Sequence, residues 1–554
     1  MKRLLLLLHT LRYLQLKQLY YRILYRVRKP RLNGLPEPVM REFFSAWEGP
    51  AYLHPATEDG KAFRFLGEVG DLQNGWNNPT FSKLWLYNLH YQDYLHATGV
   101  EGRSALNRQL VEDWIAANPP LKGNGWEPYC LSLRIVNWVK WLSRLDTDTA
   151  EAYPHLLRSL ACQANALEQQ LEFHILANHL FANAKALVFV GSFLGGREGN
   201  VWLEKGLKLL DQEIPEQFLT DGGHFELSPM YHAILLWDMC DLLQLQQQTQ
   251  LDALCKREAQ WRRVIGRGIN WLRSMVHPDG GIAFFNDATL GIAPTLRQLE
   301  AYADQLKALP ATITEKADLA LQLIYLHSSG YLVIDWPGQH RALLDAARVG
   351  PDYQPGHAHA DTLSFELSLF GQRILVNSGI SQYGEDAVRY HQRSTAAHNT
   401  LEVDGGNSSE VWLGFRVGRR AKPFDLDIHQ QAQQVEVAAS HDGYKRLRGS
   451  VIHRRHWTAR PQELVIQDKL SGQFNQAKAF FHLHPDVQLE RLDENIWRGR
   501  LPQGQFFELS FEGGAVELRS GSWQPGFGVS IPNVCLIVTL QASTLQACVS
   551  WSEN

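Results

Sequence analysis

The chain has neither a long apolar run nor an excess of charge of one sign. It holds 54 Lys and Arg against 58 Asp and Glu in 554 residues, a net charge of −4. This balance argues against nucleic acid as a partner, because proteins that bind nucleic acid usually show a basic excess. Without about 20 consecutive apolar residues, the sequence predicts no membrane-spanning helix.

Cysteine is also scarce, and no two cysteines form a CxxC pair. The six are Cys130, Cys162, Cys240, Cys255, Cys535 and Cys548. A disulfide framework is not expected in so long a chain, and buried free thiols are the simplest interpretation. The sequence leaves open whether two of the cysteines form a single disulfide bond.

The N-terminus lacks the features of an export signal. Its basic start is followed by a short apolar run, Leu4–Leu8, which ends at His9 without an Ala-x-Ala cleavage site. Residues 1–35 instead predict one amphipathic, basic helix, which either lies on an anionic membrane surface or packs on the protein body. The sequence slightly favours packing. We therefore expect a cytoplasmic or membrane-peripheral protein rather than a periplasmic one.

The rest of the chain changes periodicity once. From about 81 to 325 apolar residues recur at helical spacing without a strict repeat, which predicts helical hairpins arranged as a toroid. The following short strands and turns predict antiparallel sheets packed as a sandwich. We expect an α+β multidomain protein with an incomplete α/α toroid at 36–325 and a β-sandwich at 326–554. A cleft between two such domains is a usual place for a site.

Two polar clusters lie in the strand-rich part. Gly356–Asp361 reads GHAHAD and precedes Thr362–Leu369, which alternates like a half-buried strand. Histidines two residues apart at a strand start point to the same side, so His357 and His359 can face one reacting group or one metal. The second cluster, Arg393–Thr400, reads RSTAAHNT and enters another alternating run.

A third cluster lies in helical sequence. His174, Asn178 and Phe181 share a helical face over 174–195, with His179 beside it. An isolated Asn-His pair is equally compatible with satisfying a neighbouring helix end.

The fourth cluster marks the start of another helix. Asp221-Gly222-Gly223 predicts a tight turn, and Ser228-Pro229 is typical of an N-cap followed by the first helical residue. Tyr231 then falls in the first turn, where the positive end of the helix favours a tyrosinate or a bound carboxylate. A buried aromatic with a hydrogen-bonded hydroxyl is the structural alternative.

These clusters, in this order, resemble the heparinase II/III family of polysaccharide lyases, which is related to some alginate lyases. The resemblance runs from Trp85–Leu95 through Arg448–Arg455. It implies an α/α toroid followed by a β-sandwich, and cleavage of a uronic-acid polysaccharide or oligosaccharide by β-elimination. In that reaction a donor cancels the carboxylate charge, a base takes the C5 proton, and an acid protonates O4.

The resemblance also implies roles for single residues. Asn178 matches the position that neutralises the carboxylate, with His179 as its helper. Tyr231 matches the tyrosine that acts as base, acid or both, and His357 matches the histidine opposite it. Expected substrate-binding residues are Arg393, Glu226, Tyr383, Trp126 and Arg416. Arg393 suits bidentate binding of a carboxylate, whereas Arg416 lines the cleft or lies on a solvated strand face.

The family can also hold zinc, at positions that read His359, Asn377 and His398 in this chain. Asn stands where the family has Asp, and it lacks the charge that holds a divalent cation. The sequence therefore leaves zinc open. Asp361 is the other candidate, or it orders the histidines without touching a metal.

Two other functions stay open. The missing export signal and Asn377 favour a non-lyase role in making or modifying a bacterial surface polysaccharide, by binding, editing or hydrolysis. A glycoside hydrolase would need two carboxylates about 5–10 Å apart. Candidates are Asp221, Glu226, Asp287 and Asp361, which nothing in the sequence pairs.

Overall fold

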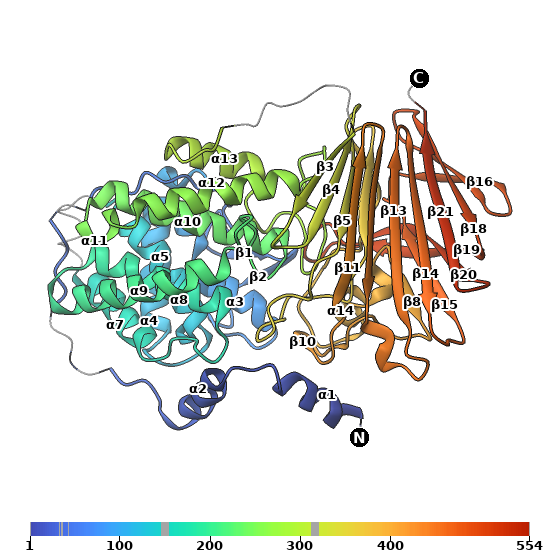
Figure 1. Ribbon diagram of the computed structural model, residues 1–554. Helices are drawn as coiled ribbons and strands as arrows, with labels where there is room; N and C mark the ends of the chain where they lie inside the picture. The colour runs from blue at the N-terminus through green and yellow to red at the C-terminus, as the bar shows by residue number, and fades with distance from the viewer. Residues whose placement is uncertain are drawn as a thin grey trace.

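A computed structural model of the chain describes residues 2–32, 34, 37–42, 44–145, 154–311 and 321–552. Figure 1 shows a lobe of helices beside a lobe of strands, with two short N-terminal helices running beneath both. Among the described residues, no helix has both the length and the apolar content to cross a membrane.

The first lobe is built from helices whose apolar faces share one core. A short hairpin, β1 (Ala62–Phe65) and β2 (Glu68–Asp71), precedes them. The helices are α3 (Lys83–Tyr91), α4 (Ser104–Ala117), α5 (Pro128–Leu142), α7 (Pro154–Glu168), α8 (Ala177–Phe193), α9 (Gly196–Gln217), α10 (Pro229–Thr249), α11 (Asp252–Cys255), α12 (Glu258–Ser274) and α13 (Leu296–Gln305). The expected α/α toroid is confirmed.

The second lobe consists of antiparallel sheets around a separate core. A five-stranded sheet contains β3 (Gln322–Leu326), β4 (Tyr331–Trp336), β5 (His340–Asp345), β6 (Phe365–Leu369) and β7 (Gln372–Leu375). A four-stranded sheet has the order β19 (Gly514–Trp523), β20 (Ile531–Leu540), β15 (Ala477–His482) and β8 (Leu401–Val403). A bridge between Leu375 and Leu483 connects these two sheets.

An eight-stranded sheet contributes to the same core. Its order is β11 (Pro423–Gln431), β12 (Gln434–His441), β13 (Ile452–Arg460), β14 (Glu463–Ser471), β21 (Thr544–Trp551), β18 (Phe506–Glu512), β17 (Ile496–Arg500) and β16 (Gln488–Asp493). Because side chains of all three sheets meet in one core, the predicted β-sandwich is confirmed.

The two lobes are joined through the five-stranded sheet, which is buried on both faces. Along β4, Tyr331 and Val333 belong to the helical core, while Leu332 and Ile334 belong to the sandwich core. This follows from the two-residue period of a strand, which sends successive side chains to opposite faces.

Strand β6 differs from the sequence expectation. The regular strand begins at Phe365 rather than Thr362, because the backbone of Leu363 has a positive φ of 61° and turns there. Its polar face is buried, not exposed: His277 of the helical lobe contacts Glu366 at 2.9 Å and Ser368 at 2.7 Å. The alternating polar residues therefore bind the other lobe instead of water.

The N-terminal segment forms two helices rather than one, α1 (Lys2–Leu11) and α2 (Leu16–Val27). The second helix follows the N-cap residue Gln15, whose N–H donates to Oε1 of Gln18. Gln18 is fully buried and donates to the carbonyls of Ile175 and Tyr353, one in each lobe. We call residues 2–32 the N-terminal arm.

A buried arginine provides a test of the sandwich core. The Arg455 guanidinium is fully buried, pairs with Asp468 at 2.8 and 2.9 Å, and donates to the carbonyls of Leu363 and Asn399. Arg455→Leu leaves the carboxylate buried without its cation. We expect it to lower the free energy of unfolding by about 3–5 kcal/mol, measured by chemical denaturation.

The neighbouring residue is the matched control. Arg454 pairs with Asp427 at 2.7 Å, but both side chains are exposed. Arg454→Leu should therefore cost less than about 1 kcal/mol. Equal losses in the two variants would contradict the structural role assigned to Arg455.

Candidate active site

A cavity of about 490 Å³ runs along helices inside the helical lobe and is also lined by Tyr383 and Phe527 of the sandwich lobe. Asn178 and Tyr231 line it from the first turns of α8 and α10. Further along the same helices, Lys185 and Asp241 also line it and bind each other at 2.6 Å. The two helices therefore line the cavity side by side, with their N-terminal ends at the same end of it.

The start of α10 follows the sequence prediction. Ser228 is the N-cap, its Oγ accepts the N–H of Tyr231 at 3.2 Å, and Pro229 is the first helical residue. Helix N-termini carry partial positive charge, so the ends of α8 and α10 favour a carboxylate between them.

The start of α8 is strained. The backbones of Leu176 and Ala177 have positive φ values of 72° and 52°, which L-residues adopt at a cost of about 1–3 kcal/mol. The helix therefore begins at Ala177, and His174 lies in the preceding turn instead of on the helical face expected for it. This geometry places Asn178 in the first turn, beside the cavity.

The Asn178 side chain is buried, yet its Oδ1 has no hydrogen-bond partner among the described residues. Its backbone N–H donates to Oε1 of Glu226 at 3.3 Å. The side-chain amide is thus held at the cavity wall without a protein partner for its oxygen, which suits the binding of a ligand.

Asp287 is the centre of the hydrogen-bond network behind the cavity. Its carboxylate contacts His357 Nδ1 at 2.9 Å and His359 Nε2 at 2.7 Å. Arg389, on α14 (Ala387–Gln392), adds a bidentate pair at 2.5 and 2.7 Å. Burial favours the neutral acid, but Arg389 and the histidines hold the pKa of Asp287 well below its usual range. A carboxylate at Asp287 accepts the Nδ1–H of His357, so in the neutral imidazole the lone pair lies on Nε2.

Tyr231 and His357 lie face to face, with ring centroids 3.7 Å apart. The Tyr231 hydroxyl lies 3.0 Å from that of Tyr383, and His357 Nε2 lies 3.5 Å from Glu226. Burial, Tyr383 and Asp287 raise the pKa of Tyr231 well above 10, so this phenol stays protonated at neutral pH. Burial also raises the pKa of Glu226. Tyr383 lines the cavity, whereas Glu226 lies beside His357 without lining it, so a role for Glu226 in binding substrate stays a prediction.

His179 does not line the cavity itself but contacts a residue that does. Its Nδ1 contacts Glu172 at 2.9 Å, and its ring packs 4.5 Å from that of Tyr129, which lines the cavity. It is therefore placed to support Tyr129 and the start of α8 rather than to reach a ligand in the cavity directly.

Arg393 does not fit its expected role in binding a substrate carboxylate. The side chain is fully buried, and its guanidinium donates to the carbonyls of Ala358, Leu413 and Gly414. It supports the loop that carries His357, because backbone carbonyls use the donors that a substrate would need.

Two further expected substrate contacts also lie elsewhere. Trp126 is buried in the helical core against Trp114, and its indole N–H donates to the carbonyl of Asn118. Arg416 is exposed, with its guanidinium 5.2 Å from the ring of Trp412. Neither side chain lines the cavity, so the alternative of a solvated strand face holds for Arg416.

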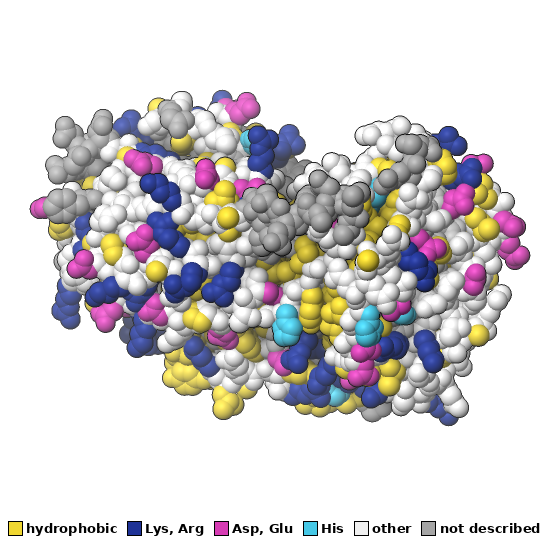
Figure 2. Space-filling view, turned by 45° about the horizontal axis from the view of Figure 1, so that its top comes forward, with side chains coloured by type: hydrophobic (Ala, Val, Ile, Leu, Met, Phe, Trp, Pro, Cys, Tyr) yellow, Lys and Arg dark blue, Asp and Glu magenta, His cyan; other side chains and the backbone are white. Residues whose placement is uncertain are grey.

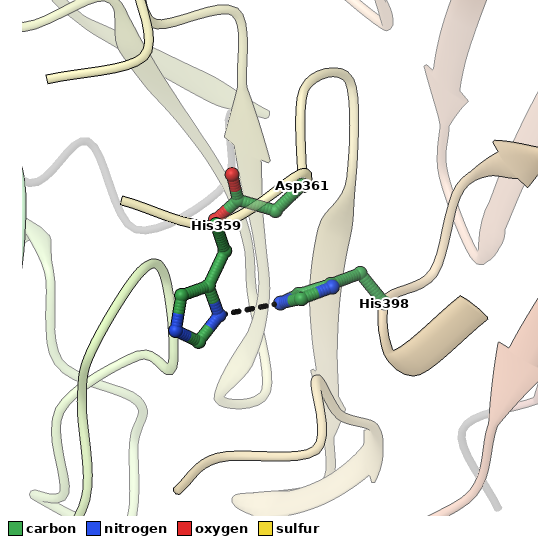
Figure 3. A group of neighbouring side chains, drawn as sticks. All are labelled: His359, Asp361 and His398. Carbon is green, nitrogen blue, oxygen red and sulfur yellow. Dashed lines mark hydrogen bonds between the residues drawn. The ribbon is translucent and has the colours of Figure 1, made fainter. Parts of the chain in front are cut away.

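The residues expected for a metal lie directly behind Asp287. Figure 3 shows His359, Asp361 and His398 gathered together, and a ligand atom from each lies within 4.8 Å of the other two. His359 Nδ1 faces His398 Nε2 at 3.1 Å. Burial lowers the pKa of both histidines to about 4, so both are neutral at pH 7.

The tautomers implied by the network fit a cation. His398 Nδ1 lies 2.7 Å from the carbonyl of Ser394 and must donate to it, which leaves a lone pair on Nε2. His359 must donate from Nε2 to Asp287, which leaves a lone pair on Nδ1. Two facing lone pairs repel each other unless a metal or a proton lies between them, and each outer contact is the kind that orients a metal ligand.

The third donor differs from the expected Asn377. The Oδ1 of Asn377 accepts the N–H of Asn399 at 3.1 Å, whereas the carboxylate beside the histidines belongs to Asp361. Asp361 offers a carboxylate to this group in place of Asn377, and burial raises the pKa of that carboxylate.

Few features of the sequence indicate the roles of Asp287 and Arg389. Asp287 follows an apolar run, Ile282–Phe285, outside all the motifs, and Arg389 is one of several arginines near residue 400. Full burial of two opposite charges distinguishes them, and burial emerges only when the lobes meet.

Two models of one protein family together match most of the chain. The family models described as Heparinase II/III N-terminus and Heparinase II/III-like, C-terminal match residues 91–312 and 320–552. FtsZ-localized protein C of Caulobacter vibrioides is 27% identical over 503 residues, 84% of this chain and 80% of that protein. Heparin-sulfate lyase of Bacteroides stercoris is 27% identical over 249 residues, 42% of this chain and 36% of the lyase.

Solved structures share the fold. The crystal structure of heparinase III aligns with a TM-score of 0.70 at 17% identity, covering 96% of this chain and 88% of that one. Heparan sulfate lyase from Pedobacter heparinus aligns with a TM-score of 0.59 at 18% identity, covering 97% and 88%. At these identities the likeness concerns architecture alone.

The pair of Glu172 and His179 gives a pH-dependent test. Burial favours the neutral imidazole, but the Glu172 carboxylate outweighs it and raises the pKa of His179. A raised pKa contributes stability that is complete below about pH 6.5 and is lost as pH rises through the folded-state pKa. Glu172→Gln should lower the pKa of His179, followed by NMR of labelled histidines.

The same variant should show the matching stability effect. The difference in the free energy of unfolding between wild type and Glu172→Gln has a part that depends on pH. This part should be largest in mild acid and should decrease as the pH rises. A His179 titration that Glu172→Gln leaves unchanged would contradict this coupling.

Proposed function

Because the chain belongs to the heparinase II/III family, we propose that it is a polysaccharide lyase that cleaves an acidic, uronic-acid-containing polysaccharide by β-elimination. The observation that carries the proposal is the grouping of three side chains around one end of the cavity. The Asn178 amide and the protonated Tyr231 phenol line this end, and the imidazole of His357 stacks on the ring of Tyr231. Each supplies one requirement of the elimination.

The first requirement is to neutralise the uronate carboxylate. A C5 proton beside a charged carboxylate is too weakly acidic to remove, because the charge of the resulting carbanion builds up next to it. The Asn178 amide donates to the carboxylate, and the N-terminal ends of α8 and α10 add their partial positive charge. Donors fixed in advance at such a position stabilise the charge that develops in the transition state.

The second requirement is a base and an acid. His357 Nε2 takes the C5 proton, and Asp287 stabilises the imidazolium through Nδ1. The C5–H electron pair becomes the C4=C5 bond, the C4–O4 bond breaks, and Tyr231 gives its proton to O4. No water is added, and proton exchange with solvent resets the two side chains.

The deeper cavity suits the sugars next to the cleaved bond. Seven residues beyond Asn178, about 10 Å along α8, Lys185 binds Asp238 at 2.5 Å and Asp241 at 2.6 Å. Asp93 also lines this part, and burial raises its pKa to about 6. Charged side chains at this depth offer donors and acceptors to sugar hydroxyls.

Hydrolysis is less well supported. A hydrolase needs one carboxyl group free to give a proton and another free to act as base or nucleophile. Of the two carboxyl groups beside His357, only Glu226 has a raised pKa, while Asp287 is bound to Arg389, His357 and His359. Asp287 is therefore not free to act as the base or nucleophile of a hydrolase.

A second candidate is a binding role without catalysis, in the making or modification of a surface polysaccharide. It is favoured by the Caulobacter vibrioides relative, which matches most of the chain and is named for localisation with FtsZ rather than for a reaction. The substrate proposal follows instead from the relatives named heparin-sulfate lyases, which match about half of the chain or less.

We also propose that His359, His398 and Asp361 hold one divalent cation, with zinc as the best match to two imidazoles and a carboxylate. When bound, the ion ties the loop of His357 to the loop of His398, and Asp287 connects it to the catalytic imidazole. Its contribution is structural, because all three donors are buried.

The lyase is tested by ultraviolet absorbance of the unsaturated uronate formed from a panel of uronic-acid polymers. Tyr231→Phe should lower the rate by about 100- to 10,000-fold, because it removes the proton donor. Asn178→Ala should lower it by about 100- to 1,000-fold. Tyr444→Phe, which removes a buried hydroxyl bonded to Leu401 in the sandwich, is the control.

The control should keep its activity near that of wild type. A wild-type rate that is indifferent to Tyr231→Phe and Asn178→Ala, with both variants folded, would remove these residues from the chemistry. Reducing ends released without the ultraviolet signal would move the proposal to hydrolysis.

The metal is tested by elemental analysis after loading with zinc and exhaustive dialysis. We expect about one zinc per wild-type chain and almost none in His398→Ala, since a site with three protein donors loses most of its affinity when one imidazole is removed. His456→Ala, on β13, is the matched control and should retain zinc. Absence of zinc from the loaded wild type would contradict the site.

A further inference from the structure

The N-terminal arm turns its apolar face away from the protein. In α2, Leu16, Leu19, Ile23 and Val27 follow one another at helical steps of three and four residues, yet all are exposed, Leu16 by 84% and Val27 by 82%. Residues at such spacing share one face of a helix. In a soluble domain that face normally lies on the core.

Helix α1 repeats the pattern. Its exposed apolar side chains are Leu4, Leu5, Leu8 and Leu11. Tyr20 of α2 extends the same surface. Figure 1 draws both helices along the lower side of the molecule, and Figure 2 shows apolar and basic side chains gathered at the lower edge.

Contacts on the opposite face fix the arm in this orientation. In α2, Gln18 donates to two backbone carbonyls of the body, Tyr25 donates to the carbonyl of Leu171, and Tyr21 packs against Phe173.

The α1 end is fixed in the same way. Thr10 Oγ1 accepts the indole N–H of Trp412 at 3.1 Å, and the Arg420 guanidinium lies 3.9 Å from the ring of Tyr13. These contacts are made largely by polar and aromatic side chains. The leucines at positions 4, 5, 8, 11, 16 and 19 remain exposed on the outside.

The charge of the arm is of one sign. Residues 1–36 contain nine Lys and Arg and no Asp or Glu, in a chain whose net charge is −4. The basic side chains described as exposed are Arg3, Arg12, Lys17, Arg22, Arg26, Arg28, Lys29 and Arg31. The arm is thus a basic strip with an apolar outer face on an otherwise acidic protein.

We propose that the arm is a docking surface for an anionic lipid bilayer, on which the whole protein lies peripherally. Helices with leucines on one side and Lys and Arg beside them lie in the interface, where the apolar side chains enter the acyl region and the cations meet lipid phosphates. An exposed apolar strip alone would also suit a second copy of the chain. Nine cations of like sign disfavour that pairing, because two arms would repel each other.

The docking is independent of the lyase chemistry. Gln18 and Tyr25 connect α2 to residues 171–175, just before Asn178, so the outward face can meet a membrane while the inner face stays on the body. A bilayer would then hold the enzyme beside a surface polysaccharide without using any group that lines the cavity.

The experiment is vesicle sedimentation of the protein with its N-terminal arm in place. Vesicles of phosphatidylcholine with about one third phosphatidylglycerol should bind it, vesicles of phosphatidylcholine alone should bind it far less, and raising the salt from about 0.1 M to about 0.5 M should weaken binding. The triple variant Leu16→Ser, Ile23→Ser, Val27→Ser should lower the partition coefficient at least about tenfold.

Two controls make the result specific. Leu518→Ser with Val529→Ser removes exposed apolar side chains from the sandwich lobe and should leave binding unchanged. Arg26→Glu with Lys29→Glu should weaken binding to anionic vesicles, whereas Arg500→Glu with Lys469→Glu, on β17 and β14, should not. Circular dichroism and thermal unfolding confirm that each variant is folded.

Failure of the wild type to bind anionic vesicles would overturn the proposal. So would binding that the arm variants leave unchanged. A dimer detected by analytical ultracentrifugation that the triple serine variant dissolves would assign the arm to a second copy of the chain instead.

Discussion

The structure of the site depends on one buried ion pair. Asp287, on a loop of the helical lobe, and Arg389, on α14 of the sandwich lobe, are both inaccessible to solvent and meet through two hydrogen bonds. Separating the lobes would leave each charge without its partner, which is strongly unfavourable for a buried ion pair, so the pair holds the two lobes together. The same carboxylate sets the tautomers of His357 and His359, which connects the catalytic imidazole with the proposed metal ligands.

The helical lobe both encloses the cavity and orients two helices, α8 and α10, around it. Because α8 and α10 point their N-terminal ends at the same end of the cavity, residues in their first turns face a substrate in a positive field. Backbone strain is also present in the segments that lead to these residues, where Leu176, Ala177, Leu227 and Asn286 have positive φ values. Such strain persists where surrounding contacts fix the conformation, and here it precedes Asn178, Tyr231 and Asp287.

Sequence reasoning succeeded where periodicity or local chemistry decides the outcome. The toroid, the sandwich and the helix start at Ser228-Pro229 follow from apolar spacing and capping, which depend on neighbours in sequence. It failed where contacts with distant parts of the chain determine the structure. The polar face of β6 is buried because His277 of the helical lobe binds it. Arg393 is buried because carbonyls of distant loops converge on it.

The single helix expected at the N-terminus illustrates the same limit. Its amphipathic pattern was visible, but the pattern alone could not tell which face meets the body. Gln18 and Tyr25 bind backbone carbonyls of the body, so they lie on the inner face of α2, while Leu16 and Leu19 lie on the outer face. Sequence rules assign the apolar face to the core, and the opposite orientation appears only when the carbonyl partners are in place.

The central claim is elimination without water, and mass spectrometry of the cleavage products tests it most directly. A defined uronic-acid oligosaccharide cut once by the enzyme should give two fragments whose masses add up to the mass of the substrate, with the double bond on the fragment that carried C4 and C5. Fragments whose masses add up to the substrate plus one water would contradict the account and make the enzyme a hydrolase.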